Sequence, residues 1–211
     1  HSNLRGIYYL KMGNFIQAEQ AFQDAIHAFF PDGTEMVLSE AQMKSNLLLA
    51  YHAENDLEQA VPLLLDLLEW MDTDDSGLSR KDEYRILSLN YSLAIQYFLE
   101  LGNEELDELK MKLEGLMKDA REGVLFEQNY VPDALFFLII SVHVLFQNGL
   151  ARDDCKKYFD VLQMVKRTAV GCLENAQRIV LCFVLSQLAW ELHSPAASVY
   201  IREAVELGRD A

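Results

Sequence analysis

Histidine, cysteine and carboxylate side chains are the groups that most often bind metals or perform catalysis, and in this chain they do not converge on a site. The four internal histidines are far apart, with no HExxH motif and no pair at metal-ligand spacing: His27, His52, His143 and His193. Cys172 and Cys182 are ten positions apart, which would place them on different turns of a helix. We therefore expect no metal site and no catalytic thiol.

Motifs for nucleotide or acyl chemistry are also missing from the sequence. The chain contains no P-loop, no GxGxxG and no GxSxG. Acidic pairs such as Glu104-Glu105 have a simpler explanation, because they begin a helical pattern and suit its positive N-terminal end. The sequence therefore predicts a protein that is not an enzyme and that binds no cofactor.

The composition and charge limit the classes of partner. The chain has 211 residues, 51% of them hydrophobic, a net charge of −15 and a pI near 4.6. This charge argues against direct contact with nucleic acid and would repel anionic membranes, whereas it favours a basic partner segment. Three cysteines without CxxC spacing indicate reduced thiols and a cytoplasmic location. The longest apolar run, 134–146, is too short for a bilayer core of about 30 Å, so we expect a buried helix there.

Small and large residues recur at spacings that suit pairs of antiparallel helices. In the first pair, small residues at 6, 18 and 25 fall where the helices would cross, and large residues at 9 and 22 fill the space beside them. The same spacing returns 42 residues later, at positions 48, 51, 60, 64 and 67. This constant offset predicts an internal repeat.

Turn signals divide the chain into five such pairs and about ten helices. The turns are expected at Gly13, Asn55, Gly102, Gly149 and His193, at intervals of 42, 47, 47 and 44 residues. The second helices of the fourth and fifth pairs should bury Cys155, Tyr158, Phe159, Leu162 and Val165, and Ala197, Ile201 and Ala204. In the third pair Asp107 occupies the place expected for a small residue. No strand pattern competes, so the fold class is all-α.

These residues and spacings resemble the tetratricopeptide repeat (TPR) superfamily, in a variant with more than its usual 34 residues or so per pair. The resemblance implies a right-handed α-solenoid of about five antiparallel helix pairs, forming a single domain over residues 1–211. Because the chain has no initiator Met and ends directly after a helical pattern, we also expect it to be a fragment of a longer protein.

By the same resemblance, the first helix of each pair lines a concave face that holds a protein or peptide. The residues expected there are Asn3, Ile7 and Lys11, then Gln42, Ser45, Asn46, Leu49 and His52, then Ser92 and Gln96, and finally Phe136, Ile140, His143, Phe183, Ser186 and Trp190. Their amides suit the capture of an extended peptide backbone. The other interpretation of Phe136, Ile140 and Phe183 is that they belong to the core. Glu19 is expected on the outer face, away from a partner.

Two functional hypotheses remain from the sequence. The first is a non-enzymatic scaffold whose concave face binds a basic or amphipathic protein or peptide. The second is a ligand- or peptide-sensing regulatory domain of a transcriptional regulator, with DNA contacted by another segment. A homo-oligomer formed through the apolar C-terminal repeats is a subsidiary expectation, because an uncapped solenoid end exposes its interior.

Overall fold

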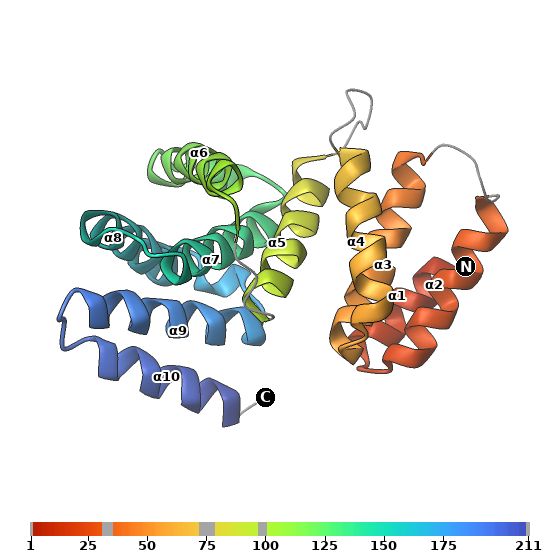
Figure 1. Cartoon of the computed structure of the whole chain (residues 1–211). Coiled ribbons are helices and arrows are strands. Elements are labelled where there is room, and N and C mark those ends of the chain that lie inside the picture. Colours follow the sequence, from red (N-terminus) through yellow and green to blue (C-terminus); the bar gives the residue numbers. More distant parts are fainter. Residues whose placement is uncertain (1, 31–35, 72–78, 97–100, 210–211) are drawn as a thin grey trace. The chain divides into compact units, whose positions relative to one another are not determined.

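The computed structural model describes residues 2–30, 36–71, 79–96 and 101–209, and these residues form an all-α protein without any strand. They fold into two compact units, residues 1–89 and 90–211, and the boundary falls within one helix. The ten α-helices of the described part are labelled in Figure 1: α1 Ser2–Lys11, α2 Phe15–Phe29, α3 Leu38–Glu54, α4 Leu57–Met71, α5 Arg80–Gln96, α6 Asn103–Arg121, α7 Val131–Gln147, α8 Arg152–Thr168, α9 Asn175–Glu191 and α10 Ala197–Arg209. Two short 3₁₀-helices, Val124–Glu127 and Val170–Cys172, precede α7 and α9.

Left-handed backbone conformations mark four of the five expected turns between paired helices. The φ angle is 70° at Gly13, 59° at Asn55, 86° at Gly149 and 54° at His193. After three of these residues, the next backbone N–H donates to the carbonyl five residues earlier, with N···O distances of 2.8–2.9 Å. This hydrogen bond is the one that closes a Schellman motif at the C-terminus of a helix. The fifth turn differs, since Gly102 has φ of −67° and its N–H donates to the Glu105 carboxylate.

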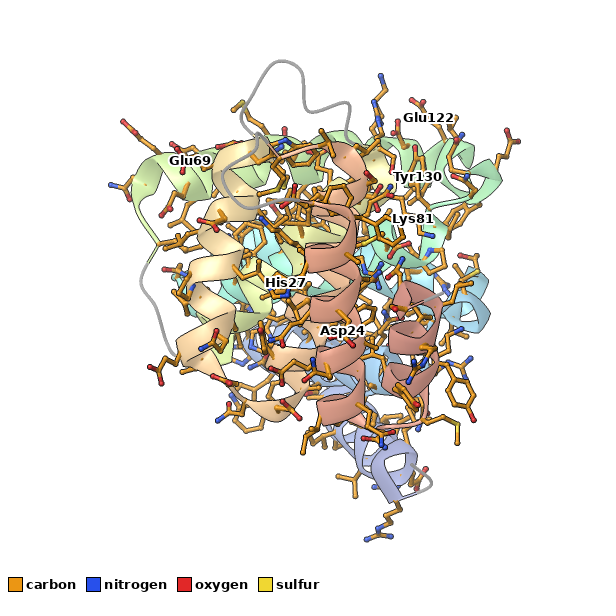
Figure 2. All side chains as sticks on the ribbon, turned by 90° about the vertical axis from the view of Figure 1, so that its right-hand side faces the viewer. Asp24, His27, Glu69, Lys81, Glu122 and Tyr130 are labelled. Carbon is orange, nitrogen blue, oxygen red and sulfur yellow. The ribbon has the colours of Figure 1, made fainter. Side chains whose placement is uncertain are left out.

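The first unit is built on the close approach of α1 and α2. A Cβ atom added to Gly6 would lie 2.4 Å from Cε1 of Phe22, so only glycine fits at this contact. Phe22 and its neighbours Ala18 and Ala25 are completely buried. Charged and polar side chains such as Asp24, His27 and Glu69 lie on the outside of this unit (Figure 2). The spacing of small and large residues therefore identified the packed face of α2.

The second pair repeats this packing at the positions predicted by the 42-residue offset. Leu48 and Ala60 are fully buried, as is Leu67, while Leu64 and Tyr51 are 5% and 4% exposed. Glycine is replaced by Leu48 and phenylalanine by the smaller Leu64, so both helices of the second pair place a leucine at these positions.

The second unit has α7 at its centre. The predicted buried helix is confirmed, because every residue from Phe137 to Leu145 is buried. None of the described helices is both long and apolar enough to cross a membrane. The expected apolar face of α8 is also confirmed, with all five of its residues buried: Cys155, Tyr158, Phe159, Leu162 and Val165.

The interpretation of Asp107 is wrong, because this residue is not at a helix crossing. Its side chain is 75% exposed and its Oδ1 lies 3.5 Å from Lys110 Nζ. The core stripe expected for α6 is present, because Leu109, Leu113 and Leu116 are buried at the same spacing as Ala18, Phe22 and Ala25. This stripe begins seven residues after Gly102, whereas the stripe of α2 begins at Ala18, five residues after Gly13.

Candidate binding site

The candidate residues of the first unit lie on α1 and α3. Lys11 and Gln42 are exposed, and Ile7 and Leu49 are half-buried. The amide of Gln42 donates to Oδ2 of Asp82 on α5 at 3.1 Å. These four side chains remain accessible to a partner, although Gln42 would have to exchange its hydrogen bond.

The other polar candidates of α3 are enclosed. Ser45 is 2% exposed and Asn46 is 7% exposed, and Asn46 Nδ2 contacts Asn3 Oδ1 at a long 3.5 Å. Ser45 Oγ and His52 Nε2 are buried, and neither has a hydrogen-bond partner in the described part of the chain. Burial lowers the pKa of His52, so its imidazole is neutral at physiological pH. These groups form a polar interior, not an open groove.

Glu19, which was expected on the outer face, is not fully exposed. It is half-buried, and Gln23 Nε2 donates to Glu19 Oε1 at 2.9 Å and to Tyr51 Oη at the same distance. Burial and the nearby carboxylates of Glu54 and Asp56 raise the pKa of Glu19. The exposed Glu69 on α4 is therefore the better control residue for a binding experiment.

On α5, Ser92 is half-buried, and the side chain of Gln96 lies outside the described residues. Metal chemistry has no support in the described ranges, where no three His, Cys, Asp or Glu side chains could together hold an ion. The cysteines are free; Cys155 and Cys182 are buried, whereas Cys172 is exposed.

The candidates on α7 belong mostly to the core of the second unit. Ile140 and His143 are 4% and 6% exposed, so for Ile140 the core interpretation holds, whereas Phe136 is half-buried. Gln147 Nε2 lies 3.1 Å from His143 Nε2, and burial lowers the pKa of this histidine. A neutral His143 therefore accepts the amide proton of Gln147, and its ring also packs against Phe183 with centroids 5.6 Å apart.

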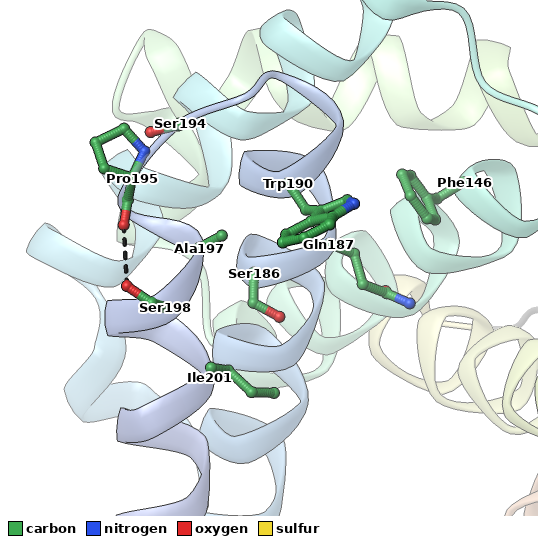
Figure 3. A pocket seen from close by; sticks show the side chains of 9 residues that line it. All are labelled: Phe146, Ser186, Gln187, Trp190, Ser194, Pro195, Ala197, Ser198 and Ile201. Atoms are coloured by element: carbon green, nitrogen blue, oxygen red, sulfur yellow. Dashed lines mark hydrogen bonds between the residues drawn. The ribbon is translucent and has the colours of Figure 1, made fainter.

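Two of the three candidates on α9, Ser186 and Trp190, line an open cavity of about 560 Å³, shown in Figure 3. Trp190 is 77% exposed at its rim, and Ser186 lines its wall. Phe183 does not line the cavity, although its side chain is 39% exposed. The remaining lining residues come from the end of α7, from α9, from the following turn and from α10: Phe146, Gln187, Ser194, Pro195, Ala197, Ser198 and Ile201.

The polar groups of the cavity are arranged unevenly. Ser186 Oγ donates to the Phe183 carbonyl at 2.6 Å, and Ser198 Oγ donates to the Pro195 carbonyl at 3.2 Å. Both hydroxyl protons are therefore already used by the main chain. Gln187 Oε1 is buried without a hydrogen-bond partner in the described structure, whereas its amide nitrogen is not enclosed. In Figure 3 the ring nitrogen of Trp190 lies on the side of Phe146.

The expected burial of α10 is only partly right. Ala204 is 7% exposed, but Ile201 is 43% exposed and Ala197 is half-buried, and both face the cavity. The reason is that α10 packs on α9 and α8 with a different face. Gln163 of α8 donates a hydrogen bond to Tyr200, and Lys166 of α8 donates one to Glu203. This packing leaves the Ala197 side of α10 uncovered by the described helices.

Phe146 and Gln187 were missed from the sequence, although a signal for them exists. Phe146 and Trp190 each lie three residues before a left-handed turn residue, Gly149 and His193. When the two helix pairs are aligned on these turn residues, Phe146 corresponds to Trp190. His143 then corresponds to Gln187, because each lies six residues before its turn. Aligning the pairs by their turns would therefore have placed both residues on the same helix face as the predicted site. Comparisons of the chain with known protein families, with curated proteins and with solved structures found no match.

Proposed function

We propose that this chain is a TPR-type scaffold without enzymatic activity, whose first helices in each pair bind a protein or peptide. Support comes from the recurring helix pair, with its left-handed turn and its crossing of small and large residues. Repeats of this kind stack into solenoids that present extended binding surfaces. A solenoid continuous over all five pairs is part of the proposal.

The observation that carries the proposal is the aromatic surface of the second unit. Phe146 and Trp190 occupy equivalent positions on α7 and α9, and Trp190 remains 77% exposed beside a cavity. Exposed tryptophans next to a pocket are typical of residues that dominate binding energy at interfaces. Since the chain carries a net charge of −15, a basic or amphipathic partner segment is the complementary occupant.

The test begins by identifying a partner through its dependence on Trp190. The wild-type chain and Trp190→Ala are immobilised in parallel, and captured proteins are compared by quantitative mass spectrometry. A partner lost only from Trp190→Ala is then titrated by calorimetry. Loss of such an anchor should cost about 2 kcal/mol, or about thirtyfold in affinity.

Glu69→Ala is the matched control, because Glu69 is exposed on the second helix of its pair. We expect its affinity to stay within twofold of the wild type. If Glu69→Ala weakened binding as much as Trp190→Ala while both variants remained folded, the partner would not bind on the first helices. Circular dichroism of each variant supplies the folding check.

A second function, ligand sensing within a transcriptional regulator, is favoured by one observation. The cavity beside Trp190 has a volume within the range of small-molecule sites, about 300–1,000 Å³. The full-length gene provides the test: a helix-turn-helix or nucleotide-switch segment beside this one would support a regulator. If the flanking segments contained only further repeats, the scaffold function would be the one that remains.

A further inference from the structure

The cavity between α9 and α10 has the properties of a site for an uncharged small molecule. Its volume of about 560 Å³ exceeds what one protein side chain fills. Its nine lining residues are aromatic, aliphatic, hydroxyl or amide in type, and none carries a charge. A buried charged group on the ligand would therefore have no counter-ion there, which is costly.

The polar groups of the cavity define the group that the ligand must carry. Gln187 Nε2 and Trp190 Nε1 are nitrogen donors, and neither has a hydrogen bond among the described residues. The hydroxyl protons of Ser186 and Ser198 are donated to main-chain carbonyls. The unused hydrogen-bonding capacity of the lining is thus that of these two N–H donors, which an acceptor on the ligand would complete, and of the buried Gln187 Oε1, which accepts.

A carbonyl oxygen is the acceptor that fits this environment. A carboxylate would enter an uncharged cavity on a chain of net charge −15, whereas a ketone, ester or amide carries no charge. The rings of Trp190 and Phe146 offer flat surfaces for an aromatic body. We propose that the cavity binds a small neutral aromatic molecule whose carbonyl oxygen accepts a hydrogen bond from Gln187 Nε2 or Trp190 Nε1. This activity goes beyond protein binding by the scaffold.

The test uses 6-propionyl-2-(dimethylamino)naphthalene, an uncharged naphthalene with one carbonyl group, whose fluorescence shifts to shorter wavelength in apolar surroundings. Titration with the full chain should show this shift and saturate at one site. The comparison probe is 1-anilinonaphthalene-8-sulfonate, which has a similar ring system but a negative charge. We expect it to bind at least about tenfold more weakly, because its sulfonate has no partner in the cavity.

Two pairs of variants locate the probe. Ala197→Trp fills the cavity and should abolish binding, whereas Val199→Trp makes the same substitution at a 58% exposed residue of α10 outside the lining. Trp190→Phe keeps a ring but removes the N–H, and Gln187→Met keeps the length but removes the amide. At least one of these two should bind the probe about fivefold more weakly, as expected for one lost hydrogen bond.

Several results would overturn the proposal. They are undiminished binding to folded Ala197→Trp, equal affinity for the anionic probe, or affinities within twofold of wild type for both Trp190→Phe and Gln187→Met. If Ala197→Trp failed to fold, Ile201→Trp fills the cavity from its 43% exposed side and gives the same decision. The titration contains no protein partner, so its failure would leave the scaffold function standing.

Discussion

The contact between Gly6 and Phe22 allows a strict test of how α1 and α2 pack. Replacing Gly6 with alanine would place a Cβ atom 2.4, 2.5 and 2.8 Å from three atoms of the Phe22 ring. The ring is completely buried. The helices must therefore separate, or the ring must leave its preferred rotamer.

Two opposing effects set the expected magnitude. Alanine favours a helix interior over glycine by about 1 kcal/mol, and overpacking a core costs about 1–3 kcal/mol. With three ring atoms closer than 3 Å, the upper part of that range applies, so we expect a net loss of up to about 2 kcal/mol. The loss cannot exceed the free energy of docking α1, because beyond that point the helix would simply detach.

Gly115→Ala is the matched control, since Gly115 is exposed within α6 and nothing lies within 4 Å of an added Cβ. It should stabilise its helix by about 1 kcal/mol. Hydrogen exchange read by mass spectrometry reports each unit separately, so we expect faster exchange in α1 and α2 for Gly6→Ala and slower exchange in α6 for Gly115→Ala. On a Phe22→Leu background, which removes the clashing ring atoms, Gly6→Ala should lose most of its cost. If Gly6→Ala slowed exchange in α1 as Gly115→Ala does in α6, the close contact would not exist.

Glu19, His193 and the cysteines give three further predictions. Because burial and neighbouring carboxylates raise the pKa of Glu19 above 4.5, its ionised form destabilises the fold at pH 7. Glu19→Gln should therefore raise the unfolding free energy at pH 7, and denaturant titrations should show this gain disappearing below pH 4.5; an equal gain at pH 4 would contradict the assignment. With φ of 54° at His193, thermal unfolding should find His193→Gly more stable than His193→Ala by about 1 kcal/mol, and the reverse order would argue against a left-handed turn. Iodoacetamide should modify exposed Cys172 before buried Cys155 and Cys182, because burial raises the pKa of Cys182 to about 11; equal rates in peptide mass spectra would refute this.

The packed faces of the helices could be predicted from spacing because a helix buries a fixed subset of its positions. Ala18, Phe22 and Ala25 recur as Ala60, Leu64 and Leu67, and all six are buried. The turns were equally readable. A left-handed residue favours glycine or asparagine, so Gly13, Asn55 and Gly149 stand out in the sequence, and His193 is recognised by the Pro195 that follows.

Accessibility of the site could not be predicted, because residue type does not show which helix packs over a side chain. Ser45 and Asn46 are polar and were expected on an open groove, yet both are buried. Ile201 is apolar and was expected in the core, yet it lines the cavity because no described helix covers its side of α10. The residue pattern of a single helix shows neither that a neighbouring helix covers Ser45 and Asn46 nor that none covers Ile201.

The left-handed turns make it possible to compare equivalent positions of the helix pairs, and the exposure of these positions differs between the two units. His52, Phe146 and Trp190 each lie three residues before such a turn, so the backbone directs all three side chains from the same place on the first helix of a pair. In the first unit His52 is half-buried at this place, and its Nε2 is buried without a hydrogen-bond partner among the described residues. In the second unit it is aromatic and, at Trp190, 77% exposed beside a cavity. The same backbone position therefore holds a half-buried histidine in one unit and an exposed tryptophan in the other, and we place the proposed partner contact and the proposed small-molecule site beside this tryptophan.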